Sequence, residues 1–298
     1  MTSSKKGFAL SLVLWIVAAL LLGVALLVSF SKDTLIITKG VKEKLEANIE
    51  ARSTLEQLKF YILTGNYDSI AISNNLTPFP SKIYLDARKQ KIGDVTITLS
   101  DLSGKINLFY PSPSMVATIA SDGKRELFYT MRDSLKDWLD KDNIVNLNGA
   151  EQAYYKLQAN KAYLPRNAPA IQSVDELWLI KGFENLSNQQ KKRLKKNFYA
   201  ITTGAGINLA LLSPLYLSKL LHLNTIELDT LLKLKKEDIE KFKEVVRKNK
   251  YYNDEYMGFY PSLKIEINIV VKKENATATF HTIIDFNKGM QVYSYEIL

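Results

Sequence analysis

The stretch FALSLVLWIVAALLLGVALLVSF, residues 8–30, contains 23 residues and no charged side chain. About 20 apolar residues in a helix are enough to cross the hydrocarbon core of a bilayer. A secretory signal peptide has a shorter apolar region, about 7–15 residues, followed by a small-residue cleavage site, and no A-x-A pattern closes this stretch. The sequence therefore predicts a retained transmembrane helix.

Positive charges flank the apolar stretch on both sides. Lys5 and Lys6 precede it, and Lys32 follows it. Because lysines next to a membrane helix favour the cytoplasmic side, the two N-terminal lysines predict a cytoplasmic N-terminus. The long remainder of the chain is then expected on the other side of the membrane.

The helical pattern continues beyond the membrane segment, from Ser31 to Thr64. Apolar residues repeat there at steps of three and four, which is typical of a helix with one apolar face. They are Leu35, Val41, Leu45, Ile49, Leu55, Leu58 and Tyr61 or Leu63. We expect one helix from Phe8 to about Leu63, and the alternative is two helices with a hinge at Gly40.

The rest of the chain alternates between strand and helix patterns. The expected strands are Lys82–Asp86, Gly93–Leu99, Lys105–Phe109, Leu263–Val271, Ala276–Phe286 and Gln291–Ile297. Between Ser114 and about Tyr251 the pattern is helical, as in Glu126–Trp138, Gly149–Gln158 and Ser173–Ile180. Helices between two groups of strands predict an insertion into an α+β domain, and the alternative is three consecutive domains. Three terminal strands alone would form a poorly covered sheet, so we expect them to join the earlier strands.

Composition excludes several classes of function. The 298 residues include no Cys and only two His, His222 and His281. The absence of Cys excludes disulfides, thiol nucleophiles and thiolate-bound metal clusters. No nucleophile-elbow, zinc-protease, Walker A or dinucleotide-binding motif occurs, so we do not expect an enzyme. The formal charge of +9 suits an acidic partner or an anionic membrane surface.

The N-terminal leader MTSSKKG is short and basic, and ends at Gly7 immediately before Phe8. It resembles the leader of the type IV pilin and pseudopilin superfamily, in which a membrane peptidase cuts after Gly. The resemblance implies cleavage between Gly7 and Phe8 and methylation of Phe8. The alternative is an ordinary N-in membrane anchor. Most members carry Glu as the fifth mature residue, where this chain has Leu12. The absence of this Glu is typical of the K-type minor pseudopilin of type II secretion systems.

Motifs over nearly the whole chain resemble that subunit, also called general secretion pathway protein K. Asp101 to Leu108 resembles its D-x-x-G-x-I-N-L hairpin, and Asp137 to Asp142 resembles its D-W-x-D-x-D motif. Gly149-Ala150-Glu151 with Tyr154-Tyr155 resembles G-A-E-x-x-Y-Y. Further matches are Asn167-Ala168-Pro169, Glu176-Leu177, Lys181-Gly182-Phe183 and a divergent segment from Thr202 to Leu212.

The resemblance implies an α+β fold with a spine helix, a pilin-like antiparallel sheet and a large inserted helical domain that is similar to sterile-alpha-motif units. The expected divisions are a leader 1–7, a membrane helix 8–30, spine and first strands 31–109, an inserted domain 110–255 and terminal strands 256–298. The implied role is a cap at the tip of the secretion pseudopilus that helps to start its assembly.

The resemblance also implies partners and a location. The expected partners are the I-type and J-type minor pseudopilins, the H-type and major pseudopilins, prepilin peptidase and the inner-membrane assembly platform. The chain would cross the bacterial inner membrane once and place its head in the periplasm. A tip subunit of a type IV pilus is the alternative within the superfamily.

A carboxylate-rich segment has spacing similar to a calcium-binding EF-hand loop. Asp140, Asp142, Asn146, Asn148 and Glu151 occupy the first, third, seventh, ninth and twelfth positions. The loop lacks the Gly that an EF-hand has at its sharp turn. Members of the family that this chain resembles bind calcium in the inserted domain, and the resemblance therefore favours a Ca²⁺ site. The alternative is a solvated turn.

A basic run, Lys191 to Lys196, raises the alternative of a membrane-anchored DNA-binding helical module. The glycine pair of a DNA-binding helical hairpin is missing, and His222-Leu223-Asn224 stands in its place. A charge run on a helix is usually a solvated face. We therefore expect no nucleic-acid partner.

Overall fold

The computed structural model describes residues 4–109, 111–157, 163–202, 204 and 206–297. The side chains of residues 4–11, 295 and 297 also lie outside the described part. Several sequence predictions reach residues outside it. They are the leader 1–7 at residues 1–3, the domain boundary at 110, the end of the predicted helix at Gln158, Thr203 in the divergent segment, and the end of the terminal segment at 298.

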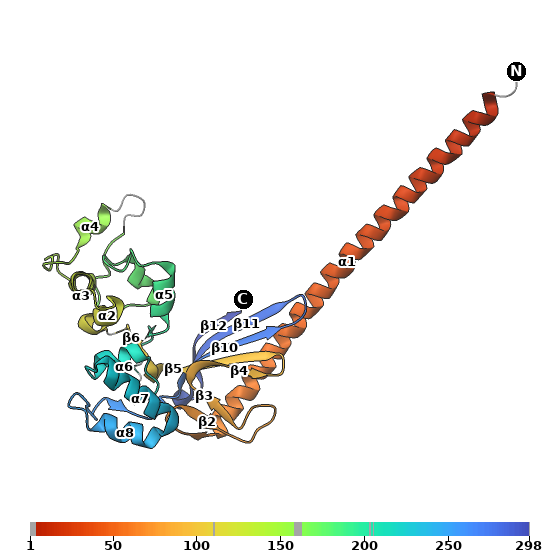
Figure 1. The fold of residues 1–298 in the computed structure, drawn as a ribbon. Helices are drawn as coiled ribbons and strands as arrows, with labels where there is room; N and C mark the ends of the chain where they lie inside the picture. Colours follow the sequence, from red (N-terminus) through yellow and green to blue (C-terminus); the bar gives the residue numbers. More distant parts are fainter. Residues whose placement is uncertain (1–3, 110, 158–162, 203, 205, 298) are drawn as a thin grey trace.

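Helix α1 spans Ser4–Thr64 without interruption and projects far beyond the head of the molecule (Figure 1). Its 61 residues correspond to roughly 90 Å at about 1.5 Å per residue. From residue 12 onward it is long and apolar enough to cross a membrane. The alternative of two helices with a hinge at Gly40 is wrong, because the helix continues through that residue.

The main sheet has five antiparallel strands in the order β12-β11-β10-β5-β4. Their bounds are β4 Asp86–Ile92, β5 Val95–Asp101, β10 Lys264–Lys272, β11 Thr277–Asp285 and β12 Gln291–Ile297. Strand β10 pairs with β5 from Ile265 opposite Asp101 to Val271 opposite Val95. The prediction that the terminal strands join the earlier strands is therefore confirmed.

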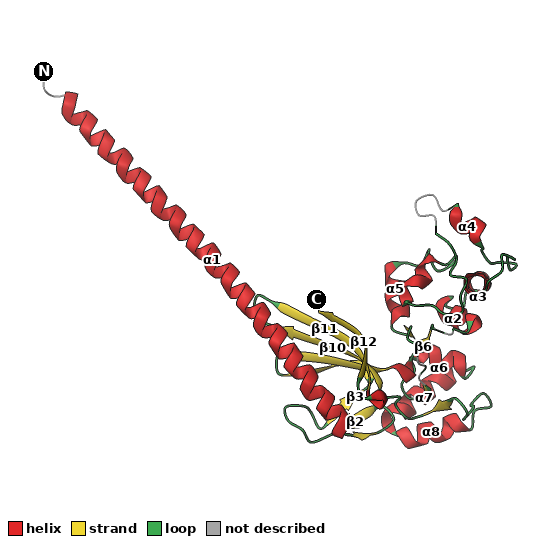
Figure 2. Cartoon of the chain, turned by 180° about the vertical axis from the view of Figure 1, so that it is seen from behind, coloured by secondary structure: helices red, strands yellow, loops and turns green. Residues whose placement is uncertain are grey.

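One face of this sheet packs against the second half of α1, as Figure 2 shows from behind. Buried and half-buried residues alternate along β10 and β11, which is the pattern of a sheet with one covered face. The core between sheet and helix contains Ala47, Ala51, Leu55, Leu58, Ile97, Leu99, Ile267, Ile269 and Phe280. The opposite face carries polar side chains, among them Glu266, Asn268 and His281.

Short strands complete the head. They are β1 Asn66–Tyr67, β2 Ala71–Ser73, β3 Lys82–Tyr84, β6 Ile106–Asn107, β7 Phe198–Tyr199, β8 Ile207–Asn208 and β9 Met257–Gly258. The predicted hairpin strand Lys105–Phe109 is shorter, and as β6 it pairs in parallel with β7. Strand β4 was not predicted, because its sequence DARKQKI is charged and lacks apolar alternation, as suits an exposed edge strand.

The helices of the inserted domain lie between β5 and β10 in the chain and have a core of their own. They are α2 Pro113–Ala120, α3 Arg125–Leu139, α4 Gln152–Lys156, α5 Asn188–Lys195, α6 Pro214–Leu220, α7 Thr225–Glu237 and α8 Ile239–Arg247. Three 3₁₀ turns, η1 Leu102–Gly104, η2 Val174–Leu179 and η3 Phe286–Lys288, complete the elements. The predicted helix Ser173–Ile180 is the turn η2. The predicted α+β class with spine helix, antiparallel sheet and inserted helical domain is confirmed.

Asp101 joins the two points where the chain leaves the sheet and returns to it. Its carboxylate, 1% exposed, accepts hydrogen bonds from the backbone N–H and hydroxyl of Ser103 at 2.9 and 2.5 Å. It also accepts from the N–H and hydroxyl of Ser262 at 3.0 and 2.7 Å, and from the N–H of Leu263 at 2.9 Å. Leu263 has φ 57°, a left-handed conformation that costs free energy in a residue with a side chain. The carboxylate therefore holds both ends of the insertion next to each other.

We expect Asp101→Ala to lower the free energy of unfolding by about 3–5 kcal/mol, because buried donors then lack an acceptor. Ser103→Ala removes one of the two donors of that residue and should cost only about 1 kcal/mol. Denaturant unfolding of the full chain in nonionic detergent, followed by circular dichroism, measures both values. Equal small losses in the two variants would contradict the role given to Asp101.

Candidate metal centre

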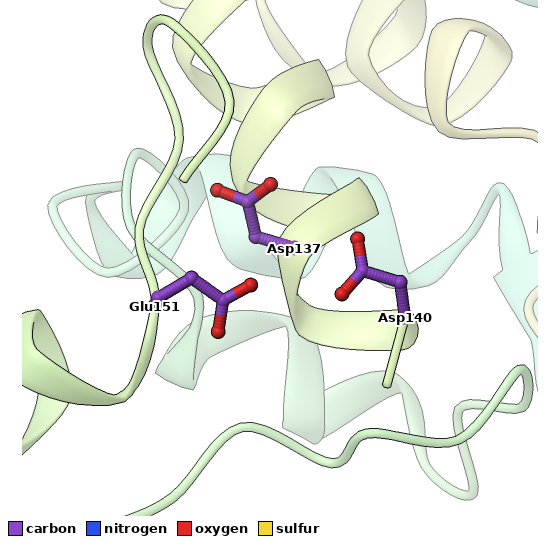
Figure 3. Close-up of side chains that lie close together, drawn as sticks. All are labelled: Asp137, Asp140 and Glu151. Carbon is purple, nitrogen blue, oxygen red and sulfur yellow. The ribbon is translucent and has the colours of Figure 1, made fainter. Parts of the chain in front are cut away.

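Three carboxylates converge where α3 ends and α4 begins. Asp137 belongs to the last turn of α3, Asp140 ends that helix, and Glu151 precedes the first residue of α4. One carboxylate oxygen of each lies within 4.8 Å of those of the other two. Figure 3 shows the three side chains pointing toward a common space between helix and loop.

Among the described residues, Asp140 and Glu151 have buried oxygens without a partner that would offset their charge. Both oxygens of Glu151, which is 3% exposed, and Oδ1 of Asp140 are buried without a hydrogen-bond partner among the described residues. Burial, reinforced by the charges of Asp137 and Asp140, raises the pKa of Glu151 to about 7. Burial and the charges of Asp142 and Asp137 also raise the pKa of Asp140. Buried anions in such a group need a cation or a proton.

The loop that follows α3 is fixed around Asp137. The side-chain amide of Asn146 donates to Oδ1 of Asp137, and its backbone N–H lies 3.3 Å from both carboxylate oxygens. A Cβ at Gly149 would lie 1.9 Å from Oδ2 of Asp137, so only glycine fits beside this carboxylate. The ammonium of Lys181 donates to the carbonyl of Gly149 at 2.8 Å and holds the loop from the other side.

Neighbouring contacts anchor the end of α3. The indole N–H of Trp138 donates to Oε1 of Glu176 at 2.9 Å, and the guanidinium of Arg166 pairs with the same carboxylate. The ring of Trp138 also meets the ring of Tyr155 edge to face, with centroids 5.1 Å apart. The helix end that carries Asp137 and Asp140 is therefore held against η2 and α4.

The sequence prediction matches this arrangement only partly. Asp140 and Glu151 lie in the group, and the sequence analysis missed Asp137, the third member. Asp142 is exposed, and its Oδ1 accepts the N–H of Ile144 at 2.8 Å, outside the group. The amide of Asn148 donates to Asp133 at 3.0 Å, and the amide of Asn146 is occupied by Asp137. The loop is therefore not arranged as an EF-hand.

A signal for Asp137 was present in the sequence. Residues three apart on a helix lie on the same face, so Asp137 and Asp140 at the end of a predicted helix form a pair. Carboxylate oxygens are the ligands that Ca²⁺ prefers in proteins, and a buried group without counter-charge fits a bound divalent cation. Asp137, Asp140 and Glu151 are the residues that could hold it.

The remaining predicted site residues lie on α1. Gly7 and Phe8 fall in its first turns, where side chains lie outside the described part. Leu12 is 53% exposed on the same helix. Cleavage of the leader stays a prediction.

Comparison with known proteins gives a family match and a structural match. Residues 121–196, which include α3, α4, α5 and the three carboxylates, match a family model described as "Type II secretion system (T2SS), protein K". No curated protein matches the chain in sequence.

A chain in the crystal structure of the GspK–GspI–GspJ complex, from the type 2 secretion system of enterotoxigenic Escherichia coli, is similar in fold. The TM-score is 0.56 at 14% sequence identity, and the match covers 88% of this chain and 98% of that chain. The resemblance to K-type minor pseudopilins of type II secretion systems is therefore confirmed, by sequence in the inserted domain and by fold over most of the chain.

Proposed function

We propose that this chain caps the tip of a type II secretion pseudopilus and helps to start its assembly for protein export across the outer membrane. The observation that carries the proposal is the place of the inserted domain. It lies across the sheet from α1 and so widens the head sideways from the spine helix, whose N-terminal end would lie in the membrane (Figure 1). A head widened by this domain is too bulky for the side of a tightly wound fibre, which favours a place at the tip with no subunit above it.

The exposed part of α1 beyond the membrane segment supports contacts with subunits below. Its apolar residues are about 59–69% exposed, and they are Leu35, Ile36, Ile37, Val41, Leu45 and Ile49. An apolar stripe of this kind marks a surface that packs against a partner. The partners in this proposal are I-type and J-type minor pseudopilins, because the similar chain was crystallised in a complex with GspI and GspJ.

Leu12 supports the same position. The carboxylate that most superfamily members carry at this place would be costly in a bilayer without a positive partner. With Leu12 the chain needs no such partner from another subunit, so it can lead a fibre rather than continue one. As the fibre grows below this chain, the tip complex would contact the H-type and major pseudopilins and the inner-membrane assembly platform.

We expect antibody labelling of assembled pseudopili to find this chain at fibre ends, at far lower frequency than the major subunit. Cross-linking should connect its α1 to the I-type and J-type subunits only, because no subunit lies above. A matched Leu12→Glu variant should keep these contacts and gain cross-links to a further neighbour. Wild-type chain distributed along the fibre would contradict capping.

The anchor and its processing complete the proposal. The chain would cross the inner membrane once, with its N-terminus cytoplasmic and its head periplasmic, and prepilin peptidase would remove residues 1–7. Its role is structural, and no catalytic chemistry is assigned to it.

Intact mass measurement of the membrane-extracted protein tests processing. We expect a chain that begins at methylated Phe8. Gly7→Leu should block cleavage yet leave the chain in the membrane, because the apolar stretch that follows is unchanged. Ser4→Ala, in the same leader, should be processed normally. A wild-type chain that still begins at Met1 would overturn the proposed processing.

We further propose that Asp137, Asp140 and Glu151 bind Ca²⁺. The ion would supply the positive charge that these buried carboxylates lack, and so would fasten the loop between α3 and α4. The buried oxygens without hydrogen-bond partners support this assignment.

Calcium should stabilise the full chain, because an ion that binds only the folded state adds about 2.7 kcal/mol at about 100 times its Kd. Glu151→Gln combined with Asp137→Asn should abolish the rise in Tm. Asp142→Asn should keep most of it, and Asp229→Asn on the exposed face of α7 should keep all of it. Thermal unfolding with calcium and with chelator measures the effect. An unchanged calcium response in the double variant would place the ion elsewhere.

A further inference from the structure

Two adjoining cavities lie between helix α5 and the outer face of the sheet, which is the face turned away from α1. Their volumes are about 630 and 380 Å³, and Ala87, Ser100, Lys105 and Lys196 line both. We call them together the basic cleft. Its cationic residues are Lys89, Lys105, Lys192, Arg193, Lys195, Lys196 and Lys235.

These cations come from four separate parts of the chain. Lys89 belongs to β4, Lys105 follows η1, Lys235 belongs to α7, and the others lie on or directly after α5. A charge run on one helix is usually a solvated face, but here the fold brings like charges together across a cleft. Their mutual repulsion costs free energy unless an anion lies between them.

The acidic residues of the cleft supply only part of this counter-charge. Asp86 pairs with Arg88 at 2.5 Å and also attracts the ammonium group of Lys235, and Asp101 is buried in the neck of the insertion. Glu266 pairs with Lys105 at 2.5 Å and with His281 at 3.0 Å, and these contacts outweigh burial and lower its pKa to about 2.

Four lysines remain without an ion-pair partner within the described part of the chain. They are Lys89, Lys192, Lys196 and Lys235. Lys235 is half-buried, and this burial lowers the pKa of its ammonium group. Burial disfavours the charged form of this ammonium group, and a ligand carboxylate beside it would stabilise that form.

We propose that the basic cleft binds an extended, carboxylate-rich segment of a partner protein. Neighbouring cavities that share walls suit a chain of several residues better than one compact anion. Binding of single-stranded nucleic acid uses aromatic side chains as stacking platforms. The described residues that line the two cavities include no aromatic side chain. The outer face of the sheet adds Thr98 and Asn268, whose polar groups can bond to a peptide.

The test measures binding of a fluorescent octaglutamate peptide to the full chain in nonionic detergent by anisotropy. We expect Lys192→Gln combined with Lys196→Gln to weaken binding about fivefold to tenfold, because two exposed charge pairs are lost. The matched control combines Lys241→Gln with Lys272→Gln, which removes the same charge from exposed positions outside the cleft. This control should bind like the wild type. Added salt should weaken wild-type binding steeply.

Three results would overturn the proposal. They are no binding of octaglutamate to the wild type, equal loss in the cleft variant and its control, and tighter binding of an oligothymidylate with the same number of charges. The last would indicate a nucleic-acid ligand. Circular dichroism of both variants checks that they fold. The cleft does not depend on tip capping, so failure here would leave that proposal standing.

Discussion

The carboxylate of Asp101 holds together two residues, Ser103 and Ser262, that are far apart in the sequence. Everything between them forms the inserted domain, and everything outside them forms the spine and sheet. Because five donors converge on one buried carboxylate, the neck of the insertion has a defined geometry rather than that of a flexible linker. The direction in which the helical domain leaves the sheet, and hence the shape of the head, follows from this contact.

Sequence patterns predicted the elements whose stability depends on regular burial. The apolar stretch 8–30 and its continuation to Thr64 predicted the spine. Alternation in β5, β10 and β11 predicted the sheet, because one face of each strand lies in the core that the sheet shares with α1. The pattern failed where burial does not decide structure. Strand β4 is a charged edge whose only requirement is pairing with β5, and β6 depends on β7, which lies about ninety residues later in the sequence.

The candidate metal site was predicted in part for a related reason. Linear spacing located the loop and two of its carboxylates, Asp140 and Glu151. It could not show that the asparagines are occupied by hydrogen bonds to Asp137 and Asp133, since those contacts need the helix end and loop in place. The missing member, Asp137, lies on the helix before the loop, outside the twelve residues that an EF-hand comparison considers.

The neck also explains why charges gather on one side of the head. By fixing the inserted domain over the outer face of the sheet, it places the lysines of α5 opposite Lys89 of strand β4. Lys105, which directly follows η1 at the neck, lines the same cavity. Neither domain alone contains the basic cleft, and each would tolerate its own charges as a solvated face. The repulsion between Lys89 and the lysines of α5 arises only when the two are joined, and the bonds of Asp101 help to offset it. Repulsion among these lysines lowers the stability of the folded chain. A ligand of opposite charge would offset the repulsion and would in turn strengthen the junction.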